Sequence, residues 1–241
     1  MNGIFQTLFY QPVLNLLVFL YNNLGDLGLA IIFLTIIVKL ILLPLSKKSI
    51  KSQKALQDLQ PKMEELKAKH KGDKQAESVA LMNLYKENKV NPFSSCLPLI
   101  VQLPFFFAIF RVFRDGFAQN HLDLLYPFIG NPETINTIAL GFLNLSERSI
   151  VLAILAGAAQ FLQGRMLHTK KPKVKTAGAK DENMLSVMNK QMLYVMPAVT
   201  VFIGLSFPAG LTLYWFLTTV FTVLQQKLVF SKEKSSIKVL K

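Results

Sequence analysis

The sequence has very little of what catalytic and metal sites usually require. Of its 241 residues one is a cysteine, Cys96, so an internal disulfide is excluded. The three histidines, His70, His121 and His168, are scattered without a cluster of cysteines or carboxylates, which argues against a metal site. Glycine-rich phosphate loops and the nucleophile and zinc motifs of common hydrolases are absent. We therefore expect no enzymatic activity and no cofactor.

Acidic residues are also scarce, and none lies inside the long apolar runs. The chain has 14 Asp and Glu against 27 Lys and Arg, and 51% of its residues are hydrophobic. A mean hydropathy of +0.37 beside a net charge of +13 is rare in soluble globular domains. The first 26 residues contain no Lys or Arg, so the basic start of a secretory signal peptide is missing. This pattern is typical of a membrane protein with basic loops.

The run LGLAIIFLTIIVKLILLPL, residues 27–45, carries a single charge, Lys39. As a helix rising about 1.5 Å per residue, it would extend about 30 Å and cross a bilayer. A lysine inside such a span costs about 2.5–3.5 kcal/mol on insertion scales, so we expect Lys39 to line a polar cavity. The alternative is that it extends to the nearby interface beside Lys47 and Lys48.

The predicted fold class is all-α: a polytopic membrane protein with five transmembrane helices, an N-terminal interfacial helix and a cytosolic helical hairpin. Residues 1–26 are expected to form an extracytoplasmic amphipathic helix, with a sixth span over residues 4–20 as the alternative. Residues 27–45 form the first span and residues 93–230 the other four. The latter are expected at 93–113, 150–167, 191–206 and 211–230, before a basic cytosolic tail at 231–241.

The hairpin is predicted over residues 46–91, which contain eleven Lys and six Asp or Glu. Gly72 followed by Asp73 predicts a helix stop and then an N-cap. Pro61 is expected to bend the first hairpin helix or to begin a new helical segment. In the later connection between the second and third spans, the apolar residues around 138–145 could form a short interfacial helix.

The basic residues predict the orientation in the membrane. Segments 46–91, 168–190 and 227–241 contain eleven, six and five lysines, whereas the opposite side would hold only three arginines. The positive-inside rule therefore places these segments in the cytosol, with the N-terminus outside and the C-terminus inside. Polar residues lie at membrane depth in most of the spans. They are Thr35 and Lys39, Gln102, Gln160 and Gln163, and Thr218, Thr219 and Thr222. They either line a common polar face or pair with neighbouring helices.

Four stretches carry a family resemblance: 35–45, 59–75, 85–110, which contains VNP, CLP and QLP, and 207–226, which contains PAGLTLYW and a later QQ. The chain resembles the conserved core of the YidC, mitochondrial Oxa and chloroplast Alb insertase family. The resemblance implies a groove that is open to cytosol and lipid and has one cation on the first span. The substrate-contacting residues would then be Lys39, Thr35, Gln102, Gln160, Gln163, Trp215 and Thr219. Lys39 replaces the family's usual Arg, and Thr219 stands where many bacterial relatives have Asn.

The resemblance also implies a function and its partners. The chain would move hydrophobic segments of nascent membrane proteins into the lipid bilayer, alone or with the Sec translocon. Further expected partners are the ribosome, the signal recognition particle and its receptor. The expected location is the bacterial inner (plasma) membrane, as a multi-pass protein. The alternative function is a small anion transporter or channel, in which Lys39 would bind the anion, although the sequence has no internal repeat to support it.

Overall fold

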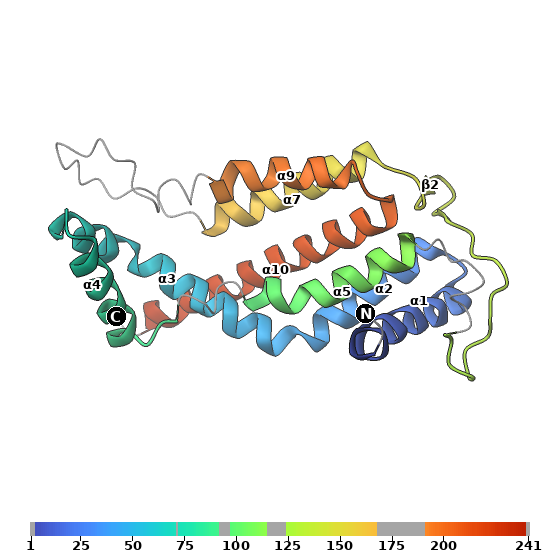
Figure 1. The fold of residues 1–241 in the computed structure, drawn as a ribbon, viewed down its shortest axis with the longest axis horizontal. Coiled ribbons are helices and arrows are strands. Elements are labelled where there is room, and N and C mark those ends of the chain that lie inside the picture. The colour runs from blue at the N-terminus through green and yellow to red at the C-terminus, as the bar shows by residue number, and fades with distance from the viewer. Residues whose placement is uncertain (1–2, 71, 92–96, 115–123, 168–190, 240–241) are drawn as a thin grey trace.

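A computed structural model describes residues 3–70, 72–91, 97–114, 124–167 and 191–239 (Figure 1). The helices are α1 (Gln11–Leu24), α2 (Leu27–Ile41), α3 (Leu43–Lys69), α4 (Lys74–Glu87), α5 (Leu97–Arg114), α7 (Ile150–Leu167), α9 (Met196–Gly204) and α10 (Ala209–Val239). The π-helical turns η1 (Gln6–Tyr10) and η3 (Gln191–Val195) precede α1 and α9, and β1 (Ile138–Ala139) pairs antiparallel with β2 (Leu143–Asn144). The prediction of a mostly helical protein is confirmed. The predicted basic link at 168–190 lies outside the described residues.

The main hydrophobic core lies where α1, α2, α5 and α10 meet. Leu17, Leu34, Ile109 and Leu211, one from each of these helices, are all 0% exposed. In Figure 1, α7 and α9 lie side by side along one edge of the bundle, and α10 runs between that pair and α2 with α5. Helix α10 therefore contacts both halves of the bundle and is its central element.

Small residues allow α7 and α9 to pack closely. A Cβ atom on Gly157 of α7 would overlap the Val201 side chain of α9. A Cβ atom on Gly204 would lie 3.1 Å from the Cβ atom of Ala153. Close backbone approach through small residues is typical of helices that associate within a bilayer, where the lipid supplies no hydrophobic drive between them.

Residues 138–145 form a β-hairpin, so the expected short helix there is wrong. Leu140 and Gly141, at the turn, have φ angles of 51° and 79°, which a right-handed helix does not allow. Asp26 holds the turn through Oδ2, which accepts the Leu140 N–H at 2.6 Å. Its Oδ1 accepts the Leu29 N–H at 2.9 Å and thereby caps α2. One carboxylate thus anchors the hairpin to the start of α2.

The long helices begin or end, in turn, at the end of the bundle where this hairpin lies. Helix α2 begins beside it, because a Cβ atom on Gly28 would lie 2.7 Å from the Cβ atom of Ala139. Helix α10 also begins there, since the Gly210 N–H donates to the Leu145 carbonyl at 2.9 Å. Helix α5 ends at the same side, where Phe113 packs against Gly210. Helix α7 starts at the same end, and α9 finishes there beside it (Figure 1). Helices α1, α2, α5, α7, α9 and α10 thus alternate in direction, whereas α3 continues onward from α2 after its bend (Figure 1).

Length and composition alone single out fewer spans than five. Among the described residues, α7 by itself is long and apolar enough to cross a membrane, and α2 with α3 passes only as a pair bent by 69°. The bend follows Ile41, whereas one straight helix over residues 27–45 was predicted. Pro44 has no N–H to donate to the Leu40 carbonyl, so the regular ladder of α2 ends before it. The number of spans stays a prediction.

Helices α3 and α4 pack against each other away from the main core. Leu59, Met63 and Leu84 form a separate small cluster, and the Tyr85 hydroxyl donates to the Met63 sulfur at 3.7 Å. Burial raises the pKa of Tyr85 above its ordinary value. Helix α3 continues through Pro61 as one element, and the Asp73 carboxylate caps α4 by accepting the N–H groups of Gln75 and Ala76. The cytosolic location of this pair stays a prediction.

Helix α1 is fastened to the loop that follows α5. Asn15 is only 1% exposed, although it is polar. Its Nδ2 donates to the Leu124 carbonyl at 3.0 Å, and its Oδ1 accepts the Tyr126 N–H at 2.6 Å. Further along α1, Asn22 donates to the Gly130 carbonyl at 2.7 Å. The loop therefore covers α1 along its length, and the placement of α1 on or across the membrane stays a prediction.

Candidate functional site

Lys39 lies in the last turn of α2 and points toward α10. Its side chain is 8% exposed, and its Nζ donates to Thr222 Oγ1 at 3.0 Å. Thr222 in turn donates to the Thr218 carbonyl at 2.9 Å. The ion pairs in the described part of the chain, Lys54 with Asp58 and Lys67 with Glu77, lie in α3 and α4. Within the described ranges, Lys39 is therefore a buried cation without a carboxylate partner.

Two candidate threonines flank this contact. Thr35 lies one turn before Lys39 on the same face of α2, and Thr219 lies one turn before Thr222 on α10. Both are buried, and each donates within its own helix. Thr35 Oγ1 bonds to the Ile31 carbonyl at 2.7 Å, and Thr219 Oγ1 bonds to the Trp215 carbonyl at 2.9 Å. Both donors are used, so each hydroxyl can offer an incoming group only its oxygen, unless it rotates away from its carbonyl.

Two further candidates form the contact between α5 and α10. The Gln102 side chain donates to the hydroxyl of Tyr214, which is 1% exposed. One turn along α5, the Phe106 ring meets the Trp215 ring edge to face, with centroids 5.6 Å apart. Gln102 and Trp215 therefore act on neighbouring turns as a polar and an aromatic contact between the same helices.

Gln160 and Gln163 do not join these groups directly. Both lie on α7 and are half-buried. Among the described residues, no hydrogen bond links either of them to Lys39, Thr35, Gln102 or α10. The structure thus assembles the candidates of α2, α5 and α10 around α10, and it leaves the α7 pair beside them on a helix that packs tightly against α10.

The polar contacts of α10 continue beyond the predicted residues. Gln226 is 0% exposed, and its Nε2 donates to Gln53 Oε1 of α3 at 3.5 Å. Its own Oε1 is buried without a hydrogen-bond partner among the described residues. The Lys54 Nζ lies 5.8 Å from the centroid of the Phe230 ring. A polar strip therefore runs from Lys39 along the contact between α3 and α10.

Sequence reasoning missed three of these groups as site residues. Tyr214 and Gln226 were assigned no role, and Thr222 was noted only as a polar residue at membrane depth. Their spacing held the signal, because Tyr214, Thr218 and Thr222, and then Gln226, lie four residues apart and share one helix face. That face is the one that meets Lys39 and Gln102.

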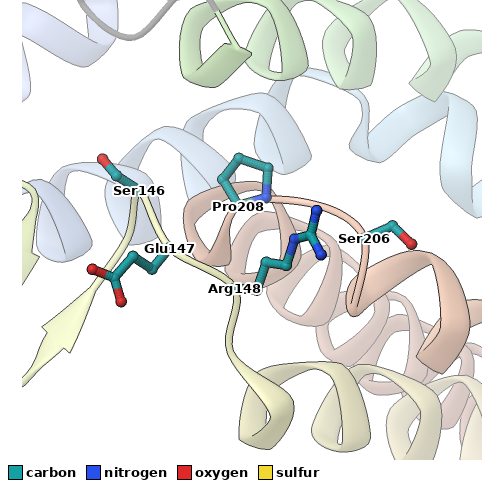
Figure 2. A pocket seen from close by; sticks show the side chains of 5 residues that line it. All are labelled: Ser146, Glu147, Arg148, Ser206 and Pro208. Atoms are coloured by element: carbon teal, nitrogen blue, oxygen red, sulfur yellow. The ribbon is translucent and has the colours of Figure 1, made fainter.

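The recess predicted beside Lys39 stays a prediction. With 8% of its surface exposed, Lys39 is nearly enclosed. Two cavities that the described residues form, of about 580 and 470 Å³, lie elsewhere and include none of the candidate residues. One is at the start of α7 and α10 (Figure 2), and the other is at the tip of the α3–α4 pair.

The outer surface of the bundle is strongly apolar. Large hydrophobic side chains are at least 40% exposed on four of the helices: Phe33, Leu40 and Ile41 of α2, Ile100, Leu103 and Phe107 of α5, Val151 and Ile154 of α7, and Leu224 and Leu228 of α10. So many exposed large apolar side chains are unfavourable in water and are typical of a membrane or protein interface. The cation on α2 lies within this apolar bundle, and the open groove that the resemblance implied around it stays a prediction.

Residues 19–236 match the model of a protein family described as 60Kd inner membrane protein. The chain belongs to this family, the YidC/Oxa family. It is 39% identical over 216 residues to the membrane protein insertase YidC of Geobacter sp. (strain M21), covering 90% of this chain and 35% of that protein. It is 35% identical over 227 residues to the membrane protein insertase YidC of Fusobacterium nucleatum, covering 92% of this chain and 97% of that protein. The sequence resemblance is thus confirmed.

The YidC fold is also recognisable in three dimensions. A crystal structure of an active YidC insertase with its first transmembrane domain resolved superposes with a TM-score of 0.59 at 25% identity. The superposition covers 92% of this chain and 46% of that chain. The chain therefore spans about a third of the length of the Geobacter relative and nearly the whole length of the Fusobacterium relative.

Proposed function

We propose that this chain is a membrane protein insertase that acts without enzymatic chemistry or a cofactor. The observation that carries the proposal is the buried Lys39, which is held by the Thr222 hydroxyl and, within the described residues, has no carboxylate partner. An unpaired cation within a membrane span is costly, so such a residue usually marks a functional site. Both relatives described above are named as membrane protein insertases, and one has nearly the same length as this chain.

Lys39 would act by lowering the cost of bringing an acidic segment of a nascent protein partway across the bilayer. An unpaired carboxylate loses many kcal/mol of hydration in hydrocarbon, and a nearby cation offsets part of this loss. Thr222 and Thr219 would supply hydrogen bonds once the contact between α2 and α10 loosens, and Gln102 would do so once it leaves Tyr214. The substrate's apolar segment would then leave along α5 and α10, past Trp215, and burial in lipid would drive this step.

The proposed topology has five spans, namely α2, α5, α7, α9 and α10, with α1 at the outer interface. The alternating helix directions around the β-hairpin support this order, because each span must reverse the direction of the one before it. The eleven lysines of residues 46–91 support a cytosolic α3–α4 pair, and residues 231–241 would form a basic cytosolic tail. These basic segments would meet the ribosome, the signal recognition particle and its receptor, and the Sec translocon would be a further partner.

Reconstitution tests the proposal against the alternative of an anion transporter. A photo-cross-linker at Thr219 should capture a stalled nascent membrane protein, whereas the same group at Val151, on the outer face of α7, should capture lipid. Vesicles that contain the purified full chain should insert the released substrate. Anion flux without a nascent chain, together with no capture at Thr219, would favour the transporter instead.

A further inference from the structure

A polar cavity of about 580 Å³ lies at one end of the helix bundle, far from Lys39 in the fold. Its lining consists of Ser146, Glu147, Arg148, Ser206 and Pro208 (Figure 2). The first three residues join β2 to α7, and the last two belong to the turn between α9 and α10. The cavity therefore lies where three helices begin or end. Its volume is within the range of small-molecule sites.

The cavity holds opposite charges at its two sides. The Arg148 guanidinium is directed between Pro208 and Ser206, whereas the Glu147 carboxylate points away from it (Figure 2). Glu147 is positioned by Asn144, whose Nδ2 donates to Glu147 Oε1 at 2.8 Å. Arg148 is exposed and forms no ion pair or hydrogen bond with any other described residue. Five guanidinium N–H donors are thus available to an anionic ligand.

Exposed apolar side chains continue directly from this polar lining. Ile150 and Val151, the first two residues of α7 and close to Arg148 in the chain, are 66% and 67% exposed. Leu205, just before Ser206, and Phe202 of α9 are 36% and 72% exposed. A ligand that fits both parts has a charged head and a long apolar body. Since these helix ends would lie at a membrane surface, a lipid meets both requirements.

We propose that this cavity binds the headgroup of a membrane phospholipid of the phosphatidylethanolamine type. The phosphate is held by Arg148, and the ammonium group is held on the Glu147 side. The acyl chains lie along the exposed faces of α7 and α9. A headgroup with a phosphate but no ammonium, such as that of phosphatidylglycerol, satisfies Arg148 alone and leaves Glu147 as a repulsive neighbour.

The inference rests on the proposed embedding of α7, α9 and α10 in a bilayer, but not on insertion of substrates. Native mass spectrometry of the detergent-purified full chain measures lipid binding without any insertion substrate. Equal amounts of phosphatidylethanolamine and phosphatidylglycerol are added, and the lipid retained on the folded protein is quantified. The wild type should retain phosphatidylethanolamine preferentially, and millimolar inorganic phosphate should not displace it, because the apolar contacts are specific to the lipid.

Two substitutions give distinct expected results. Arg148→Gln should lower retention of both lipids by about tenfold, the size of effect expected for a hydrogen bond to a charged group. Glu147→Gln should leave phosphatidylglycerol retention equal to or above that of the wild type and remove the preference for phosphatidylethanolamine. Arg165→Gln, at the far end of α7, is the matched control and should change neither. Arg165 is exposed like Arg148, but its guanidinium carbon lies 5.9 Å from the Phe161 ring centroid and not in the cavity.

Thermal unfolding of each variant in detergent checks that the fold persists. Unchanged retention by folded Arg148→Gln, or a wild type that shows no preference between the two lipids, would overturn the proposal. Displacement by inorganic phosphate would show a free-anion site instead and would also overturn it. Lys39→Gln separates this site from insertion, because it should reduce insertion and leave lipid retention intact.

Discussion

The Lys39 Nζ and the Thr222 hydroxyl link α2 to α10 across 3.0 Å, although 183 residues separate them in the chain. The same hydroxyl donates to the Thr218 carbonyl of its own helix. Thr222 therefore satisfies a buried cation and its own helix with a single oxygen. The contact closes the bundle next to the proposed substrate path, and it must loosen before a substrate carboxylate can reach Lys39.

Replacing Thr222 tests this closing contact. Thr222→Val keeps the shape of the side chain but removes the hydroxyl oxygen that accepts from Lys39. The buried Lys39 ammonium then has no such acceptor, and we expect the free energy of unfolding to fall by about 1–3 kcal/mol. Thermal unfolding in detergent measures the change, and Thr222→Ser, which retains the oxygen, should remain close to wild type. Equal unfolding temperatures for the Val and Ser variants would contradict the contact.

Gly210 tests the packing at the start of α10. A Cβ atom there would overlap the Phe113 ring of α5, so Gly210→Ala should destabilise the bundle by about 1–3 kcal/mol. Gly3→Ala, where a Cβ atom has open space, is the control and should have little effect on unfolding. A second change, Phe113→Leu, should relieve part of the overlap. A double variant that is no more stable than Gly210→Ala would show that the ring is not the obstacle.

Asn15 tests the fastening of α1 to the loop after α5. Asn15→Ala removes the bonds to Leu124 and Tyr126, so amide hydrogen exchange over residues 124–130 should become faster. Asn23→Ala provides a matched control, because within the described part of the chain Asn23 donates only to the Phe19 carbonyl of its own helix. If both variants exchange at the wild-type rate, the loop is held mainly by other contacts.

Leu84 tests whether the α3–α4 pair is a separate cooperative unit. Leu84→Ala opens the small cluster with Leu59 and Met63, and we expect a local cost of about 2–3 kcal/mol. Limited proteolysis should then cut within residues 46–91 earlier while the helix bundle stays intact. Val79→Ala, at a side chain that is 55% exposed, should be cut like the wild type. Loss of the whole fold on Leu84→Ala would mean that the pair and the bundle unfold together.

Local signals in the sequence predicted some of these features well. The apolar run at 150–167 coincides with α7, and the single charge in the run 27–45 drew attention to Lys39, which lies buried at the contact between α2 and α10. The first signal is the hydropathy of neighbouring residues, and the second is the free-energy cost of burying a charge. Hydropathy and charge of this kind can be read without knowledge of the fold.

Other features depend on contacts between distant residues and could not be read locally. Gln102 donates to Tyr214, which is 112 residues away in the chain, and no local sequence pattern predicts that these two residues pair. The sequence allowed a short interfacial helix at 138–145, because the apolar content of this β-hairpin is similar to that of such a helix. Its conformation is set by the Leu140–Gly141 turn and by the Asp26 carboxylate more than a hundred residues away. Tertiary contacts overrode local propensity there.

The central claim, that Lys39 attracts acidic segments, is tested most directly by charge reversal. Insertion of a substrate with an acidic translocated tail into vesicles is measured by protease protection, for the wild type, Lys39→Arg and Lys39→Glu. Opposite charges 4 Å apart at an effective dielectric constant near 20 interact by about 4 kcal/mol, so Lys39→Glu should lower insertion at least about tenfold. Lys39→Arg should insert normally, and a substrate with a basic tail should recover insertion by Lys39→Glu. Undiminished insertion of the acidic substrate by Lys39→Glu would contradict the proposed role of the cation.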